Sequence, residues 1–130
     1  MGFLDNFRST KAEGIQNTWK VLDKMEQLSS LEDASFQRPV AIFKHSVSCG
    51  ISSMTKFQLE SGWDIDAESL DFYYLDLLAN RAISNKVADQ FGIRHQSPQL
   101  ILLNKGKVVY DTSHHGIQYS KLKSVLEGLK

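Results

Sequence analysis

The stretch Pro39–Ser52, with the sequence PVAIFKHSVSCGIS, joins an apolar run to the single cysteine of the chain, Cys49. Val40–Phe43 is continuously apolar, which is typical of a strand covered on both faces. Residues 48 to about 61 follow with a helical pattern, so the sequence predicts that Cys49 lies at the start of a helix. A thiol in that position is either a small core residue or a nucleophile.

The helix after Cys49 has apolar residues at a spacing of three. This spacing predicts that Ile51, Met54 and Phe57 form its buried face and that Gly62 ends it. Other polar residues predict helix starts: Asp23–Glu26 has the form of a capping box, and Ser84 and Ser120 are candidate N-caps. We expect strands over 19–22, 40–43, 70–76, 100–103 and 108–110, and helices over 23–35, 48–61, 84–91 and from 120 onward.

Strands that alternate with helices predict an α/β fold with parallel strands. The turn at Asn104–Lys107 adds an antiparallel hairpin, so the sheet should be mixed and flanked by helices. The sequence shows no internal repeat, linker or low-complexity tract. We therefore expect one domain over residues 18–130, preceded by a weakly patterned lead-in segment over residues 1–17.

The composition excludes several classes of function. The chain has 130 residues, of which 42% are hydrophobic and 23% charged, and its 15 basic and 15 acidic residues balance. Balanced charge gives no electrostatic footprint for nucleic acid or an anionic membrane. No stretch approaches the roughly 20 apolar residues that span a bilayer, and no secretory signal is recognisable. One cysteine forms no internal disulfide, which fits a cytoplasmic protein.

Two longer stretches carry a resemblance to known families. Phe91–Val109, FGIRHQSPQLILLNKGKVV, resembles the second half of a thioredoxin fold, in which a cis-proline opens a buried strand. That likeness implies a cis bond between Ser97 and Pro98. Phe43–Ser46, Ser48–Ser52 and Ser97–Gln99 together are similar to the YtxJ-type, monothiol bacilliredoxin-like proteins of the bacillithiol system, over residues 18 to 129.

One position departs from that family. The family commonly has Cys-Pro-Ile-Ser, and here Gly50 replaces the proline. Cys49–Ser52 therefore also resembles the Cys-Gly-Phe-Ser box of monothiol glutaredoxins, which hold iron–sulfur clusters with glutathione. The flanks favour the bacilliredoxin likeness, because Lys44 lies five residues before Cys49, Ser97 precedes Pro98, and the chain has no Gly-Gly pair.

The chemistry of the expected site follows from the thiolate, which is the species that attacks disulfides. The N–H groups at a helix start favour the anion. Lys44 and His45 could add positive potential near the sulfur, and Ser52, one turn into the helix, could donate a hydrogen bond to it. The predicted catalytic residues are thus Cys49, Ser52 and Lys44. The predicted substrate groove comprises Gly50, Ile51, Ser97, Pro98 and Gln99.

The resemblance implies a reaction in which Cys49 takes a small thiol, bacillithiol, from an S-thiolated client protein. A second small thiol or another redoxin then frees Cys49. We expect no tightly bound cofactor. We also expect no metal site among the four histidines. One of them, His95, lies three residues before Pro98 and is a further candidate for approaching Cys49. Two alternatives stay open: an iron–sulfur cluster carrier, and a non-enzymatic adaptor with a thioredoxin fold.

Overall fold

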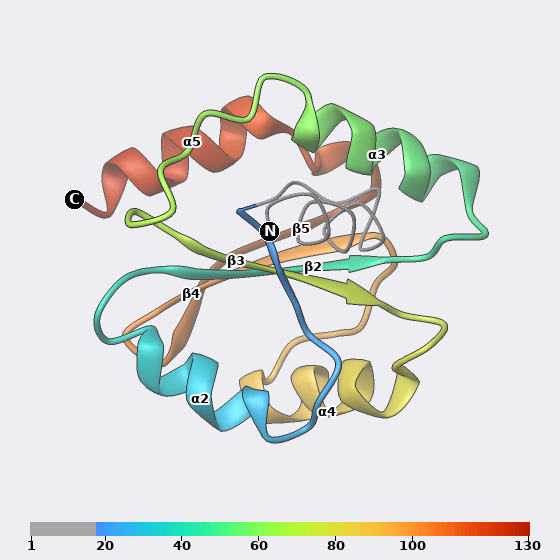
Figure 1. Ribbon diagram of the computed structural model, residues 1–130, viewed down its shortest axis with the longest axis horizontal. Coiled ribbons are helices and arrows are strands. Elements are labelled where there is room, and N and C mark those ends of the chain that lie inside the picture. The colour runs from blue at the N-terminus through green and yellow to red at the C-terminus, as the bar shows by residue number, and fades with distance from the viewer. Residues whose placement is uncertain (1–17) are drawn as a thin grey trace, which may run out of the picture.

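The computed structural model describes residues 18–130, and the predicted lead-in segment over residues 1–17 lies outside the described residues. Within them, one mixed five-stranded sheet is flanked by helices on both faces (Figure 1). The strands are β1 Lys20–Val21, β2 Val40–His45, β3 Asp71–Asp76, β4 Gln99–Asn104 and β5 Lys107–Ser113. The helices are α2 Gln27–Ala34, α3 Gly50–Glu60, α4 Arg81–Phe91, the 3₁₀ turn η1 His114–Gly116, and α5 Tyr119–Gly128.

The sheet order is β1-β3-β2-β4-β5. β1, β3 and β2 run parallel, β4 is antiparallel to β2, and β5 is antiparallel to β4. The predicted order of elements and the mixed α/β sheet are confirmed. β2 is the central strand, and all six of its residues are buried, as its unbroken apolar run predicted.

Alternation along β2 separates two cores, because successive side chains of a strand point to opposite faces. Ala41 and Phe43 pack with α3 and α5, whereas Val40 and Ile42 pack with α2 and α4. Figure 1 shows these helix pairs on opposite sides of the sheet. The next two residues continue the pattern, so Lys44 faces the α2/α4 side and His45 faces the α3 side.

The buried face of α3 differs from the prediction. Ile51, Met54 and Phe57 are 47%, 74% and 71% exposed, while Ser52, Thr55 and Leu59 are buried. The reason is the period of the helix. A spacing of three residues drifts around a helix of 3.6 residues per turn, whereas the spacing of three and then four keeps Ser52, Thr55 and Leu59 on one face.

The start of α2 is not the predicted capping box. The helix begins at Gln27 and no side chain caps its first turn. Instead, the Gln27 side-chain oxygen accepts hydrogen bonds from the backbone N–H groups of Asp23 and Lys24, at 2.9 and 2.8 Å. The Gln27 side chain therefore takes the part that the capping box assigned to Glu26, which was to accept the N–H of Asp23.

The two predicted serine caps are also wrong. α4 begins at Arg81, and Ser84 is buried inside it. α5 begins at Tyr119, so Ser120 lies in its first turn. In both cases the helix starts before the serine, and the N-cap residues are Asn80 and Gln118. A serine near a helix start indicates the region of the cap but not the residue that forms it. The predicted end of α4 at Gly92 is confirmed by its left-handed backbone, with φ of 66°.

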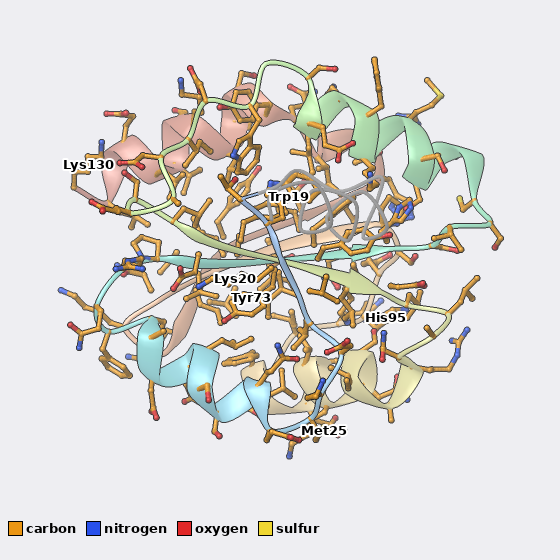
Figure 2. The ribbon with its side chains drawn as sticks, in the orientation of Figure 1. Trp19, Lys20, Met25, Tyr73, His95 and Lys130 are labelled. Carbon is orange, nitrogen blue, oxygen red and sulfur yellow. The ribbon has the colours of Figure 1, made fainter. Side chains whose placement is uncertain are left out.

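The first strand is shorter than predicted. β1 spans two residues, and Trp19, just before it, buries its ring on the α3/α5 side of the sheet, where Figure 2 labels it. Val21, two residues after Trp19, is 39% exposed. Among residues 18–130, no helix combines the length and the apolar content that crossing a bilayer needs.

Candidate active site

Cys49 lies between the end of β2 and the start of α3. It is the N-cap residue of α3, with an extended backbone of φ −107° and ψ 122°, and its side chain is half-buried. Its N–H bonds to the carbonyl oxygen of Ser46 at 3.1 Å, and its own carbonyl accepts from Ser53 at 3.0 Å. The thiol is therefore carried at a helix start, whose first N–H groups have no partner within the helix, and no side-chain hydrogen bond caps this start.

Ser52 holds the loop that precedes Cys49. Its Oγ accepts the N–H of Ser46 at 3.0 Å and lies 2.7 Å from Nδ1 of His45. Burial, and then the charge of Lys56, lower the pKa of His45, against opposing effects of Asp76 and Ser52. Oγ of Ser52 and Nδ1 of His45 therefore share one hydrogen bond, whose donor depends on the tautomer of the ring. Among residues 18–130, the Ser52 hydroxyl bonds to His45 and to the N–H of Ser46 and not to the sulfur of Cys49.

Lys44 lies on the other side of the sheet from α3. The residue is fully buried, and Nζ donates to the carbonyl of Ser84 at 3.0 Å and to Nδ1 of His95 at 3.1 Å. Burial lowers the pKa of Lys44 to about 8. Lys44 was predicted to add positive potential near the sulfur, and in the structure its ammonium bonds to Ser84 and His95. The sequence alone could have predicted this side of the sheet. Lys44 follows Ile42 by two residues in β2, and residues two apart in a strand point to the same face.

The loop before β4 is fixed by buried polar contacts. The Ser97–Pro98 peptide bond is cis, and the Pro98 carbonyl accepts from the N–H of His114 at 3.1 Å. Gln99 is 1% exposed; its amide donates to the Arg94 carbonyl at 3.0 Å and its side-chain oxygen accepts from the N–H of Gln96 at 3.2 Å.

Gln99 was predicted to line the substrate groove. In the structure its side chain is buried, and its amide holds the loop before β4 through Arg94 and Gln96. Ser97 is half-buried, Pro98 is buried, and Gly50 and Ile51 are exposed. Cys49 lies shortly after the end of β2, and Pro98 lies directly before β4. These two strands are paired, with Lys44 of β2 opposite Gln99 of β4. The two predicted motifs thus meet at one end of the sheet.

The comparison with protein families decides what this arrangement is. The model of a family described as monothiol bacilliredoxin BrxC matches residues 20–122. This chain belongs to the monothiol bacilliredoxin family. The match includes both halves of the site, Cys49 with α3 and Pro98 with β4, and the resemblance inferred from the sequence is confirmed.

Solved structures show that this bacilliredoxin has a thioredoxin fold. A structure described as a candidate oxidoreductase with a thioredoxin fold is 26% identical, has a TM-score of 0.72, and covers 86% of this chain and 96% of its own. Thioredoxin of Malassezia sympodialis is 20% identical, with a TM-score of 0.65 and coverages of 85% and 89%. Thioredoxin of Fasciola hepatica is 19% identical, with a TM-score of 0.65 and coverages of 85% and 99%.

Sequence reasoning missed the contacts of two parts of the site of this bacilliredoxin. His45 was expected to add positive potential near the sulfur, and its bond to Ser52 was not predicted, although the alternation of β2 places it on the α3 side. The turn η1 was not predicted; the N–H of its His114 donates to the Pro98 carbonyl, and its residues border a pocket of about 500 Å³ beside α3. The residues that line this pocket include Ile51, Met54, Phe57, His114, His115 and Ile117.

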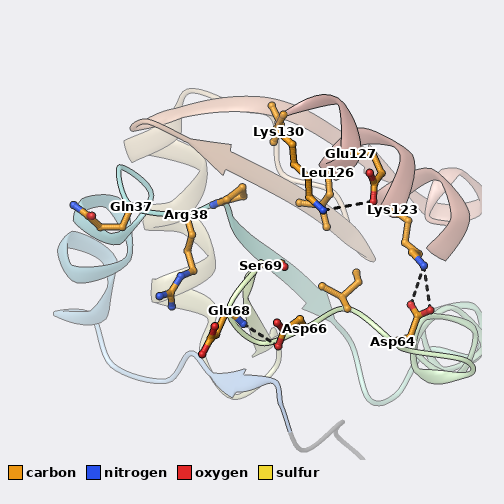
Figure 3. A pocket seen from close by; sticks show the side chains of 13 residues that line it. Gln37, Arg38, Asp64, Asp66, Glu68, Ser69, Lys123, Leu126, Glu127 and Lys130 are labelled. Carbon is orange, nitrogen blue, oxygen red and sulfur yellow. Dashed lines mark hydrogen bonds and ion pairs between the residues drawn. The ribbon is translucent and has the colours of Figure 1, made fainter.

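A second pocket, of about 440 Å³, lies at the other end of the sheet, where β2 begins (Figure 3). Its cations are already paired with carboxylates. Lys123 bonds to Asp64 at 3.0 Å, and the nearest carboxylate oxygen of Glu127 is 3.7 Å from Nζ of Lys130. This pocket lies at the end of the sheet away from Cys49, and Cys49 is not among its lining residues.

Proposed function

We propose that this chain is a monothiol thiol–disulfide oxidoreductase that removes bacillithiol from S-thiolated proteins through Cys49. The single observation that carries the proposal is the position of Cys49, the only cysteine of the chain, at the N-cap of α3 in a thioredoxin fold. Membership of the monothiol bacilliredoxin family supports a redox role of this kind.

The reaction is an exchange without net oxidation. The Cys49 thiolate attacks the small-thiol sulfur of the mixed disulfide, a new S–S bond forms between them, and the client cysteine leaves as a thiolate that takes a proton from water. A second small-thiol thiolate then attacks the small-thiol sulfur on Cys49. This step releases the small-thiol disulfide and restores the Cys49 thiolate, so electrons come from the small-thiol pool or a redoxin.

The chain offers no second thiol for an internal step. Ser52 lies one helical turn beyond Cys49, and its hydroxyl bonds to His45 and to the N–H of Ser46. A hydroxyl does not exchange with a disulfide, so the mixed disulfide on Cys49 has to be resolved by an external thiol. We further propose that the reaction takes place in the cytoplasm and needs no tightly bound cofactor.

The test uses a client protein with one cysteine capped by bacillithiol. The wild-type chain should release the free client thiol and gain the mass of bacillithiol on Cys49, as read by mass spectrometry without reductant. Cys49→Ser should do neither, while circular dichroism shows that it is folded. Release of the cap at equal rates by the wild-type chain and by Cys49→Ser would contradict the proposal.

The same variants separate the two alternatives. The iron–sulfur alternative has one specific observation in its favour, Gly50 after the cysteine. Anaerobic reconstitution that yields a coloured protein with iron and sulfide, lost in Cys49→Ser, would support that carrier. If the chain is an adaptor, Cys49→Ser should bind the client proteins as well as the wild-type chain does. Client binding would then not depend on the thiolate fraction of Cys49.

A further inference from the structure

The buried ammonium of Lys44 has an unusual set of partners. Nζ bonds to the carbonyl of Ser84 and to Nδ1 of His95, and within residues 18–130 no carboxylate forms a salt bridge with it. Burying a charge without a counter-charge is unfavourable. A lysine in such a place must therefore contribute something other than stability.

The contact fixes the protonation of His95. An ammonium has only donors, so Nδ1 of His95 has to accept, and the ring proton must lie on Nε2. The Ser84 hydroxyl, 3.4 Å from the same Nδ1, is compatible with this arrangement. Burial, the charge of Lys44 and the charge of Arg81 all lower the pKa of His95. The imidazole is thus neutral near pH 7, with one defined N–H donor.

That donor is available to a ligand. The side chain of His95 is exposed, and no hydrogen bond joins Nε2 to another residue within residues 18–130. Figure 2 shows His95 on the α4 side of the sheet. The charges that act on it, from Lys44 and Arg81, are both positive, in a chain of zero net charge. A hydrogen-bond donor in positive potential suits an anionic acceptor.

His95 and Cys49 belong to two loops at the same end of the sheet. His95 lies three residues before Pro98 in a loop that Gln99 braces through Arg94 and Gln96. Lys44 pairs with Gln99 across the β2–β4 ladder and precedes Cys49 by five residues. The donor and the thiol therefore leave the sheet at the same end, and the donor sits on a preorganised loop.

We propose that His95 forms a subsite for a carboxylate group on the small-thiol half of the mixed disulfide, and that Lys44 is the positioning residue that fixes its donor. The inference rests on the proposed function, because it concerns which disulfides Cys49 accepts. It gives Lys44 a role in substrate selection, exerted through His95, in place of a direct effect on the sulfur.

The experiment compares one client protein carrying two different caps. Glutathione supplies two carboxylates, and 2-mercaptoethanol supplies none. The measured quantity is the ratio of kcat/KM for the glutathione cap to kcat/KM for the 2-mercaptoethanol cap. A hydrogen bond to a charged group predicts that His95→Ala lowers this ratio by about tenfold or more. Lys44→Met should lower it in the same direction, because Nδ1 loses the donor that orients the ring.

The controls separate this role from a structural one. A general loss of folded protein lowers both kcat/KM values and leaves the ratio unchanged. Asn85→Ala, which removes an exposed polar side chain on α4, should also leave the ratio unchanged. Alkylation of Cys49 by neutral iodoacetamide should proceed at the wild-type rate in Lys44→Met, whereas a direct electrostatic role of Lys44 requires a slower rate.

Two results would overturn the subsite. One is a wild-type ratio near one, and the other is a wild-type ratio that His95→Ala does not change. Both differ from failure of the proposed function, in which the wild-type chain releases neither of these caps nor the bacillithiol cap. That last outcome would remove the reaction and the subsite together, whereas the first two leave the reaction standing.

Discussion

Replacing Lys44 by methionine should remove a pH-dependent part of the stability. Burial lowers the pKa of this side chain from 10.5 to about 8. Below pH 8 the folded and unfolded states both hold the proton, so the folded protein bears the full disadvantage of a buried charge. Between about pH 8 and 10.5 only the unfolded state holds it, so the free energy of unfolding rises with pH.

The size follows from the shift. One pKa unit corresponds to about 1.4 kcal/mol, so the whole shift corresponds to at most about 3 kcal/mol. Over the lower part of the window, from pH 8 to about 9.5, the wild-type chain should gain about 2 kcal/mol relative to Lys44→Met. Tyr74, whose pKa burial raises to about 12, acts at higher pH with the opposite sign.

The measurement is urea unfolding followed by far-ultraviolet circular dichroism at several pH values across this window. Lys24→Met is the matched control, because the Lys24 side chain is 65% exposed and its replacement should give a difference that does not vary with pH. A constant difference between wild type and Lys44→Met would refute the reasoning. It would mean that burial of this ammonium is fully compensated by its two hydrogen bonds.

Three further changes test the packing around the site by the same unfolding measurement. Ser52→Ala should lose about 1–3 kcal/mol, because the buried N–H of Ser46 loses its acceptor; no loss would mean that water replaces the hydroxyl. Gly116→Ala should lose about 1–3 kcal/mol through collision of its Cβ with Thr112, while Gly128→Ala meets nothing and should not destabilise. Phe57→Ala should stay within about 0.5 kcal/mol, whereas a buried Leu59 implies a loss of about 2–5 kcal/mol for its own change to alanine.

The sequence was sufficient for the features that depend on local pattern. Val40–Phe43 predicted the buried central strand, and the turn at Asn104–Lys107 predicted the hairpin of β4 and β5. The placement of Cys49 at a helix start also followed from local pattern, because an apolar strand and a helical segment meet there. The family likeness supplied the position of Pro98.

The features that depend on tertiary packing were harder to predict. The buried face of α3 was assigned from the largest apolar residues, although small residues such as Ser52 fit the close approach to β2. The destination of Lys44 required knowing that β2 exposes alternate residues to two different helix layers, and that the loop with His95 returns beside it. Gln99 likewise acts on a loop whose path no local pattern defines.

The two tryptophans of the chain give it a built-in optical reporter. Trp19 lies 5.3 Å from Trp63 and 4.3 Å from Phe72, ring centre to ring centre, so the indoles share one apolar cluster. Trp19 directly precedes β1, an edge strand that pairs with β3 over two residues. Detachment of that edge would expose one indole while the backbone signal of the remaining sheet persists. Emission and circular dichroism recorded together would therefore separate fraying of this edge from global unfolding.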